Sequence, residues 1–447
     1  MDNLLLAPDS SSFNLLDRII QFGDSPLLVM GWLLTHGAWI VLIWIVLWGL
    51  RELWLDARQA KFMRAQTFVV LAIDVPRATE QTVKAVENMF AHLAGAHSEP
   101  TFLEKWIDGK VQTVLSCEII SIEGHVQFLI RCVNKARDLV EASIYAQYPD
   151  AEITEVEDYT ARAPKRFPDE AYDCFAFEFT PVKAGRDVYP LKTYMDFEHQ
   201  LTSEFKDPVA VLLETLARLG PGEQLWYQIL VKPIAQTDFV AKVTKEVKKV
   251  TGQKEPVKKN VVDKALDLPI TALGMAGDVV FGAGGAPVKK KDENALNSRM
   301  WNLTPGERKL VESLERKMSK IAFQVKIRVV YLAKKEAFNK AKVGYSIVGA
   351  MKQYNSNDAL ALKPEGKRVG VSSTMIFMKE RRNNVRKGKL IRAYANRSSW
   401  VGLPTFFLNT EELASLWHLP VSLFVKAPQV KKTESKKTEP PINLPFG

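Results

Sequence analysis

The longest apolar stretch of the chain lies near its start, and the rest of the chain is patterned differently. Residues 25–50 carry no charged side chain and read SPLLVMGWLLTHGAWIVLIWIVLWGL. About 20 apolar residues in a helix, each rising about 1.5 Å, cross the roughly 30 Å hydrocarbon core of a bilayer. The pattern therefore predicts a transmembrane helix over residues 25–50. Residues 1–24 precede it, and a polar juxtamembrane helix over residues 51–65 is expected to continue it.

Beyond residue 66 the apolar positions follow strand and helix periods that predict a first compact domain over residues 66–160. Strand patterns cover residues 68–75, 111–122, 126–133 and 151–157, and an amphipathic helix follows the first and the third of them. Glu123 and Gly124, between the two middle strands, are typical of a tight hairpin turn. The resulting βαββαβ order predicts a ferredoxin-like domain.

A similar pattern begins again at Cys174 and predicts a second α+β domain over residues 173–425. Strands are expected over residues 174–180, 224–233, 322–332 and 374–379, and helices over residues 208–219 and 336–354. An insertion over residues 235–303 separates the two middle strands, and the role of its central part, residues 252–297, stays open. Thr304 and Glu307 form a capping-box pattern that predicts a helix start after the insertion. The second domain is therefore expected to be another βαββαβ unit.

The last part of the chain loses its apolar periodicity. Asn409 to Glu412 predicts one further helix start. Residues 426–447 are rich in Lys and Pro and poor in apolar side chains, so we expect a disordered tail there. The expected fold class is α+β, with one transmembrane helix, two ferredoxin-like units and this tail.

The distribution of charge predicts the orientation of the transmembrane helix. The net charge is +10, yet Arg18 is the only basic residue among the first 50 residues, which hold four aspartates. Arg51, Arg58, Lys61 and Arg64 follow the helix directly. Lys and Arg beside a membrane span are retained on the cytoplasmic side. We therefore expect a single pass through the inner or plasma membrane, with the N-terminus outside and the domains in the cytoplasm.

A cleaved signal peptide is the alternative interpretation of residues 25–50. Signal peptides have a shorter apolar core and a small-residue cleavage site, and no such site follows Leu50. Cys117, Cys132 and Cys174 are too few and too scattered for a disulfide framework or a CxxC metal site. The cysteine content therefore favours a reducing, cytoplasmic location for the domains.

Sequence motifs that carry catalysis are missing from the chain. A P-loop needs GxxxxGK followed by Ser or Thr, whereas Gly344 to Gly349 is followed by Ala350. Neither HExxH nor GxSxG occurs. We therefore expect a protein that is not an enzyme and that holds no cofactor or metal. An enzyme whose site assembles only in three dimensions stays open as another class.

His36 is the one ionisable residue within the predicted span. Ionisable groups in a membrane are costly, so a functional role is one interpretation. A neutral histidine hydrogen-bonded to a partner helix is the alternative, and we favour it. On this interpretation the main role of the predicted span is to anchor the chain.

Eight basic residues cluster between residues 379 and 397, with Tyr394 and Trp400 close by. They are Lys379, Arg381, Arg382, Arg386, Lys387, Lys389, Arg392 and Arg397. Positive charge interleaved with aromatic rings suits phosphate binding and base stacking. Attraction to anionic lipid, at about 1 kcal/mol per basic residue near the surface, or plain solvent exposure explains the same cluster. The segment is therefore a candidate site for nucleic acid or for lipid.

Four stretches of the chain resemble a family of bacterial membrane-anchored proteins of unknown function that are associated with FtsK/HerA-like ATPases of type IV secretion or conjugation. The stretches are Ala142 to Thr154, Ile347 to Ala359, Phe407 to Val421 and Glu439 to Phe446. In that family such a region accompanies a Walker-type motor, whereas this chain contains no P-loop. The resemblance therefore implies a non-ATPase subunit whose motor is on another polypeptide.

Two functional hypotheses follow from the sequence. The first is a membrane-anchored cytoplasmic scaffold or docking subunit of a secretion or conjugation apparatus, part of an oligomeric assembly with a separate motor ATPase. The second is a membrane-tethered nucleic-acid-binding protein that uses residues 379–397 to bind DNA or RNA. Steep loss of binding with salt would favour the second hypothesis.

Overall fold

The computed structural model describes residues 39–76, 81–183, 185–197, 207–252, 303–366, 368–371 and 377–420. They divide into two compact units. The first unit contains Met1–Gln66 and Pro100–Val111, and the second contains Thr67–Glu99 and Gln112–Gly447. The predicted extracytoplasmic segment, His36, the central part of the insertion and the predicted tail lie outside the described residues.

The first unit is built on one long helix, α3 (Trp39–Ala65). Its N-terminal half is the described part of the predicted span, and the large apolar side chains between Trp39 and Leu50 are exposed. The helix continues without a break through the polar residues 51–65. Among the residues that the structure describes, no helix has an apolar stretch long enough to cross a membrane. Residues 100–111, with the short π-helix η3 (Glu104–Asp108), complete the unit.

The second unit begins with strands and helices in the order predicted for residues 66–160. The elements are β1 (Phe68–Asp74), α4 (Val83–Leu93), η2 (Ala94–Ala96), β2 (Leu115–Ile122), β3 (His125–Val133), η4 (Asn134–Ala136), α5 (Arg137–Tyr145) and β4 (Glu152–Val156). The hairpin turn predicted between β2 and β3 is confirmed, because Glu123 and Gly124 both have positive φ, 54° and 89°. Such a pair of left-handed residues matches the twist of antiparallel strands.

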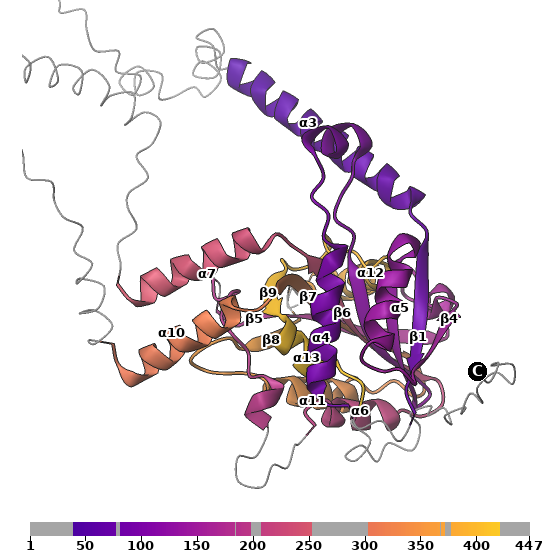
Figure 1. The fold of residues 1–447 in the computed structure, drawn as a ribbon. Coiled ribbons are helices and arrows are strands. Elements are labelled where there is room, and N and C mark those ends of the chain that lie inside the picture. Colours follow the sequence, from indigo (N-terminus) through magenta and orange to yellow (C-terminus); the bar gives the residue numbers. More distant parts are fainter. Residues whose placement is uncertain are drawn as a thin grey trace, which may run out of the picture. The chain divides into compact units, whose positions relative to one another are not determined.

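The later part of the second unit contains the remaining strands of the sheet. The elements are η5 (Tyr159–Arg162), β5 (Tyr172–Pro181), η6 (Tyr194–Phe197), α6 (Ala210–Ala217), β6 (Glu223–Pro233), α7 (Gln236–Val250), α10 (Pro305–Met318), β7 (Ala322–Lys334), α11 (Lys340–Lys352), β8 (Leu362–Glu365), α12 (Lys379–Ala395), β9 (Phe406–Asn409) and α13 (Thr410–Leu416). Helix α7, within the predicted insertion, and helix α10, directly after it, lie side by side (Figure 1). The predicted capping box of Thr304 and Glu307 is confirmed at the start of α10.

Half of the final strand predicted over residues 374–379 lies outside the described residues, and its described part forms a turn and the start of a helix. The fourth strand of this part is β8, which ends at Glu365, and Lys379 is already the first residue of helix α12. Apolar residues around Phe377 favoured the prediction. What defines β8 is instead its pairing with β5, in which Glu365 lies opposite Glu178.

All nine described strands form one antiparallel sheet in the order β4-β1-β3-β2-β6-β7-β5-β8, with β9 beside β7. The expected α+β class is therefore confirmed. The strands of the two predicted domains meet where β2 pairs with β6, from Leu115 opposite Val231 to Ile122 opposite Gln224. Each half has the strand order fourth, first, third, second when it is followed from the outer edge of the sheet to the β2–β6 junction.

The sheet is covered on both faces. On one face, helices α4, α5, α6, α11 and α13 contribute to a large apolar core in which Trp417 meets Phe90 and Phe128 edge to face, at 6.1 and 5.8 Å between ring centroids. On the other face a smaller core surrounds Trp226, with α12 packed against β5 and β7. This second face carries a set of buried charges, and it positions the predicted basic segment.

Candidate functional site

Four polar side chains lie directly opposite one another in the middle of the sheet. Glu118 of β2 pairs with Gln228 of β6, Gln228 with Arg328 of β7, and Arg328 with Glu178 of β5. All four are buried within the second unit. A buried charge without a partner costs several kcal/mol, so this row needs compensating groups. The segment formed by α12 and the residues that follow it supplies many of them.

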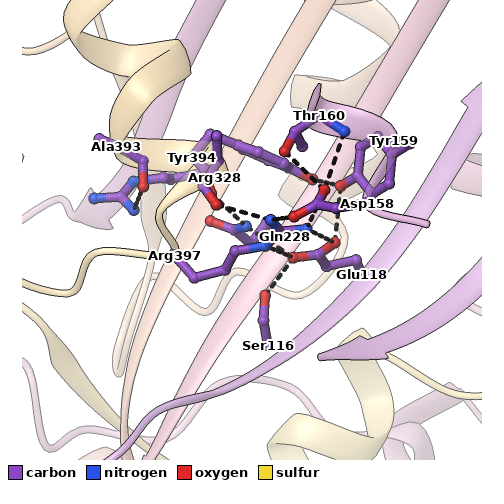
Figure 2. Close-up of polar contacts among 11 residues, drawn as sticks. Ser116, Glu118, Asp158, Tyr159, Thr160, Gln228, Arg328, Ala393, Tyr394 and Arg397 are labelled. Atoms are coloured by element: carbon purple, nitrogen blue, oxygen red, sulfur yellow. Dashed lines mark hydrogen bonds and ion pairs between the residues drawn. The ribbon is translucent and has the colours of Figure 1, made fainter. Parts of the chain in front are cut away.

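The Glu118 carboxylate is the centre of this network (Figure 2). Its Oε1 accepts hydrogen bonds from Ser116 Oγ at 2.6 Å, Gln228 Nε2 at 2.9 Å and Arg397 Nε at 2.9 Å. Its Oε2 accepts from Tyr159 OH at 2.8 Å and Arg397 Nη2 at 3.1 Å. Burial alone would raise the pKa of Glu118, but the Arg397 guanidinium and these donors hold it below its ordinary value.

Arg397 joins two distant carboxylates to the end of α12. Its guanidinium pairs with Glu118 and also with Asp158, just before η5. Burial disfavours a charged guanidinium, yet the Glu118 carboxylate outweighs it and raises the pKa of Arg397. The backbone of Arg397 has φ +48°, a left-handed conformation that residues other than glycine seldom adopt. The ion pairs therefore fix both the side chain and the turn that ends α12.

Two tyrosines extend the network toward α12. The hydroxyl of Tyr159 donates to Glu118, and it lies 2.8 Å from the hydroxyl of Tyr394. Both rings pack on Trp226, with centroids 5.2 and 5.3 Å away. Burial raises the pKa of both tyrosines well above their ordinary value, so they stay neutral donors at physiological pH. Both Glu118 oxygens accept hydrogen bonds within this network. The network therefore serves to position α12 on the sheet.

The other half of the row holds the loop after α12. Arg328 Nε donates to Glu178 Oε1 at 2.6 Å, and its two other nitrogens donate to the carbonyls of Ala393 and Val401. Lys326 Nζ donates to the carbonyl oxygens of Ser399 at 2.6 Å and Val401 at 3.1 Å. Burial lowers the pKa of Lys326 to about 8. Buried charges of β5 and β7 thus hold residues 393–401 on the sheet.

Close backbone approach completes this contact. Gly402 has φ +104°, and a Cβ atom there would overlap the Glu178 carboxylate. The carboxylate accepts the backbone N–H of Leu403 at 2.6 Å. Gly388, in the middle of α12, faces the backbone of Lys165, whose oxygen would be 3.0 Å from an added Cβ. Small residues therefore let α12 and its loop lie close to their supports.

The eight basic residues predicted as a site divide by orientation. Lys379, Arg381, Lys389 and Arg392 are exposed on α12. Arg382, Arg386 and Lys387 are half-buried; Arg386 donates to the carbonyl of Gly370, and Lys387 pairs with Asp173. Arg397 is buried in the network. The structure therefore places seven of the eight basic residues on α12. It places the eighth, Arg397, in the buried network that holds this helix on the sheet.

An exposed aromatic residue lies beyond the end of α12. Trp400 is 73% exposed, and Lys232 Nζ lies 5.8 Å from the centroid of its ring. Burial lowers the pKa of Lys232. A shallow cavity of about 400 Å³ is lined by Met378, just before α12, and by Arg381, Arg382, Val385 and Arg386 of α12. Exposed charge and an exposed ring on one segment make the outer surface of α12, with Trp400, the candidate binding surface.

The described residues contain no group of three or more His, Cys, Asp or Glu side chains that would hold a metal ion. The three cysteines are buried, and burial raises the pKa of each thiol. His418 is buried with Nε2 2.9 Å from Asp207 Oδ1. These groups lie in the core.

Sequence patterns did not identify Glu118, Asp158, Tyr159, Glu178 or Arg328 as a network. A signal was present, because Glu118 and Arg328 are charged residues in the middle of mostly apolar strands. Such residues need buried partners, but the charged partner of Glu118, Arg397, is 279 residues away. Local spacing therefore could not reveal the pairing.

The fold and this surface define an α+β protein with a basic helix held on one face of an antiparallel sheet. The chain belongs to the family described as a domain of unknown function, DUF8128, whose model matches residues 55–432. The match includes the whole sheet, the buried network and α12. No curated protein matches the chain.

Proposed function

We propose that this chain is a membrane-anchored docking subunit, in which α3 belongs to the anchor and the nine-stranded sheet is the platform. The observation that carries the proposal is the exposed apolar surface of α3 between Trp39 and Leu50. In the second unit, by contrast, the strands bury their apolar residues. Proteins in water seldom expose a large continuous apolar surface, and a lipid bilayer is the environment that suits one.

The strand order supports a finer proposal for the platform. Each half of the sheet has the order fourth, first, third, second, with neighbouring strands antiparallel, and each half follows a βαββαβ course. This is the arrangement of a ferredoxin-like unit. We therefore infer two such units joined edge to edge through β2 and β6, the second interrupted by α7, the insertion and α10.

The partner proposed for the platform is a separate FtsK/HerA-like motor ATPase of a secretion or conjugation type apparatus. The support is the resemblance of Ala142 to Thr154, Ile347 to Ala359 and Phe407 to Val421. In the described residues these stretches contribute to β4, to the end of α11 and to buried α13. The three stretches therefore lie within the platform. In this proposal the partner ATPase hydrolyses ATP and drives transport.

Co-purification tests the docking proposal. The full chain is recovered from native membranes in a mild detergent, and the proteins bound to it are identified by mass spectrometry. Recovery with a motor ATPase supports the proposal, and the R381E/K389E/R392E variant tells whether α12 makes the contact. Recovery of the chain alone from membranes that contain the ATPase would count against a docking role.

The second candidate function is binding of nucleic acid by the outer surface of α12. The observation that favours it is the exposure of Lys379, Arg381, Lys389 and Arg392 on one helix, with Trp400 after it. Lysine and arginine neutralise phosphates, and an exposed indole can stack on a base. The shallow surface gives no base-specific pocket, so the binding would be sequence-independent.

The salt dependence of binding tests this second candidate. Each neutralised phosphate of duplex DNA contributes about −0.9 to the slope of log affinity against log salt, so R381A/K389A/R392A should flatten the slope by about 2 to 3. The control is K335A/K340A/K363A, which neutralises three exposed lysines elsewhere on the second unit. Equal slopes for both triple variants would rule out α12 as the nucleic-acid surface.

A further inference from the structure

Residues 100–111 form a clasp around one side of α3, and we use the name α3 clasp for this segment. The indole Nε1 of Trp54 donates to the carbonyl oxygen of Trp106 at 3.3 Å. The Arg51 guanidinium lies 5.5 Å from the centroid of the Trp106 ring. Gly109 has φ +69°, and a Cβ atom there would overlap the backbone of Arg58. The clasp therefore holds α3 along two turns that directly follow the apolar part.

The polar groups of the α3 clasp are bonded to one another. Glu104 accepts from the backbone N–H and the hydroxyl of Thr101 at 2.8 and 3.1 Å, and from Lys110 Nζ at 2.9 Å. The hydrogen bond from Lys110 is the main reason that the pKa of Glu104 falls to about 2. The fold of the clasp is thus built from local polar bonds and one ring contact, between Phe102 and Trp106 at 6.0 Å between centroids, and its apolar side chains stay largely uncovered.

These apolar side chains point to solvent. Phe102 is 73% exposed, Leu103 64% and Ile107 56%. On α3 beside them, Leu53 is 66% exposed and Trp54 55%. A cluster of this kind on a small unit marks a surface that another apolar phase covers.

The position of the clasp along α3 identifies that phase. Trp54 follows Leu50, the last residue of the apolar run, by about 6 Å along the helix axis. One headgroup layer of a bilayer is about 5 to 8 Å thick. Tryptophan settles in this layer, and the Arg58 guanidinium lies 4.6 Å from the Trp54 ring centroid, where it can meet lipid phosphate. The clasp is therefore at the depth where hydrocarbon gives way to water.

We infer that the α3 clasp is a lipid-binding element, which inserts Phe102, Leu103 and Ile107 into the headgroup layer of the membrane that α3 enters. Interfacial segments bury apolar side chains about 5 to 10 Å into this boundary. The inference rests on the proposed anchor role of α3. It adds a second membrane contact, from a part of the chain about 50 residues further on, which would fix the helix in depth and in rotation.

A fluorescent probe at three positions tests this inference on the full chain. The native cysteines are buried, so Leu103→Cys, Trp44→Cys and Tyr345→Cys each add one reactive thiol for an environment-sensitive dye. Tyr345, 81% exposed in the second unit, is the aqueous control. Each labelled protein is reconstituted into vesicles of phosphatidylcholine and phosphatidylglycerol in about equal parts, either without a quencher, with a lipid that carries a nitroxide in the headgroup layer, or with a lipid that carries a nitroxide deep in its acyl chain.

The expected result is a blue-shifted emission at position 103 that the shallow quencher reduces, while position 345 stays unshifted and unquenched. A probe at 103 that behaves like the one at 345 overturns the inference. A blue shift without lipid quenching also overturns it, because a second copy of the chain then covers the clasp. The probe at position 44 separates the two claims: quenching at 44 by the deep nitroxide, without quenching at 103 by the shallow one, leaves the anchor standing without the clasp, and quenching at neither position refutes both.

Discussion

The guanidinium of Arg397 forms two hydrogen bonds with the carboxylate of Glu118, at 2.9 and 3.1 Å, although 279 residues separate them in the chain. One partner lies two residues after helix α12, and the other lies in the middle of strand β2. The pair therefore connects the basic helix α12 to the point where the two halves of the sheet meet. Removing either side chain should therefore affect both the position of α12 and the junction between the two halves of the sheet.

The first prediction concerns this pair. Glu118→Ala or Arg397→Ala should each lower the free energy of unfolding by about 3 to 5 kcal/mol, because the remaining charge stays buried without its partner. The double variant should lose less than the sum of the single losses, with a coupling of about 1 to 3 kcal/mol. Urea denaturation of the detergent-solubilised full chain measures all four proteins. Additive losses would show that the two side chains act independently.

The second prediction concerns the pH dependence of stability through Lys326. Its pKa falls from 10.5 to about 8 in the native state. Between these values the unfolded chain binds a proton that the native chain does not, so stability rises with pH. We expect the free energy of unfolding to increase by about 2 kcal/mol from pH 8 to pH 10.5, relative to Lys326→Met measured in the same buffers. Parallel pH profiles for the two proteins would contradict the lowered pKa.

The third prediction uses two glycines with positive φ. Gly402→Ala places a methyl group against the Glu178 carboxylate, whereas Gly185, at φ +82°, has no atom within 4 Å of an added Cβ. Gly185→Ala should therefore cost only backbone strain, about 1 kcal/mol, and Gly402→Ala at least about 2 kcal/mol more. Thermal unfolding of both variants checks the difference. Equal costs would mean that the loop after α12 can move away from β5.

The fourth prediction separates fold from surface on α12. The R381A/K389A/R392A variant should keep the unfolding free energy of the parent within about 0.5 kcal/mol, because exposed substitutions seldom cost more. Leu390→Ala, on the buried side of the same helix, should cost about 2 to 5 kcal/mol. Denaturation curves of the two variants provide the comparison. A large loss in the triple variant would mean that these charges support the fold.

Much of the second unit could be predicted because its signals are local. The turn at Glu123 and Gly124 and the capping boxes at Thr304 and Asn409 depend on a few neighbouring residues, and the structure has each of them. The strand β8 escaped prediction because it is short, contains Pro364 and is defined by its pairing with β5. Its signal lies in a distant part of the chain.

The candidate site was predictable only in part. Composition located the basic segment, but it grouped Arg397 with the surface residues because a local count of charges cannot distinguish a side chain that faces inward. The junction of β2 with β6 also went unpredicted. In β6, apolar residues occupy consecutive positions over residues 225–227 and 229–231, which is typical of a strand buried on both faces, and this would have been the available signal.

Alkaline extraction of membranes tests whether α3 belongs to a membrane anchor. Membranes containing the full chain are washed at alkaline pH and sedimented, and the chain is measured in the pellet and the supernatant. A variant with Leu42, Ile45 and Val46 replaced by Lys is the control, since lysine in a span opposes insertion. If α3 is part of an anchor, the parent chain stays in the pellet and the variant is released. Release of the parent chain into the supernatant would show that α3 does not anchor it.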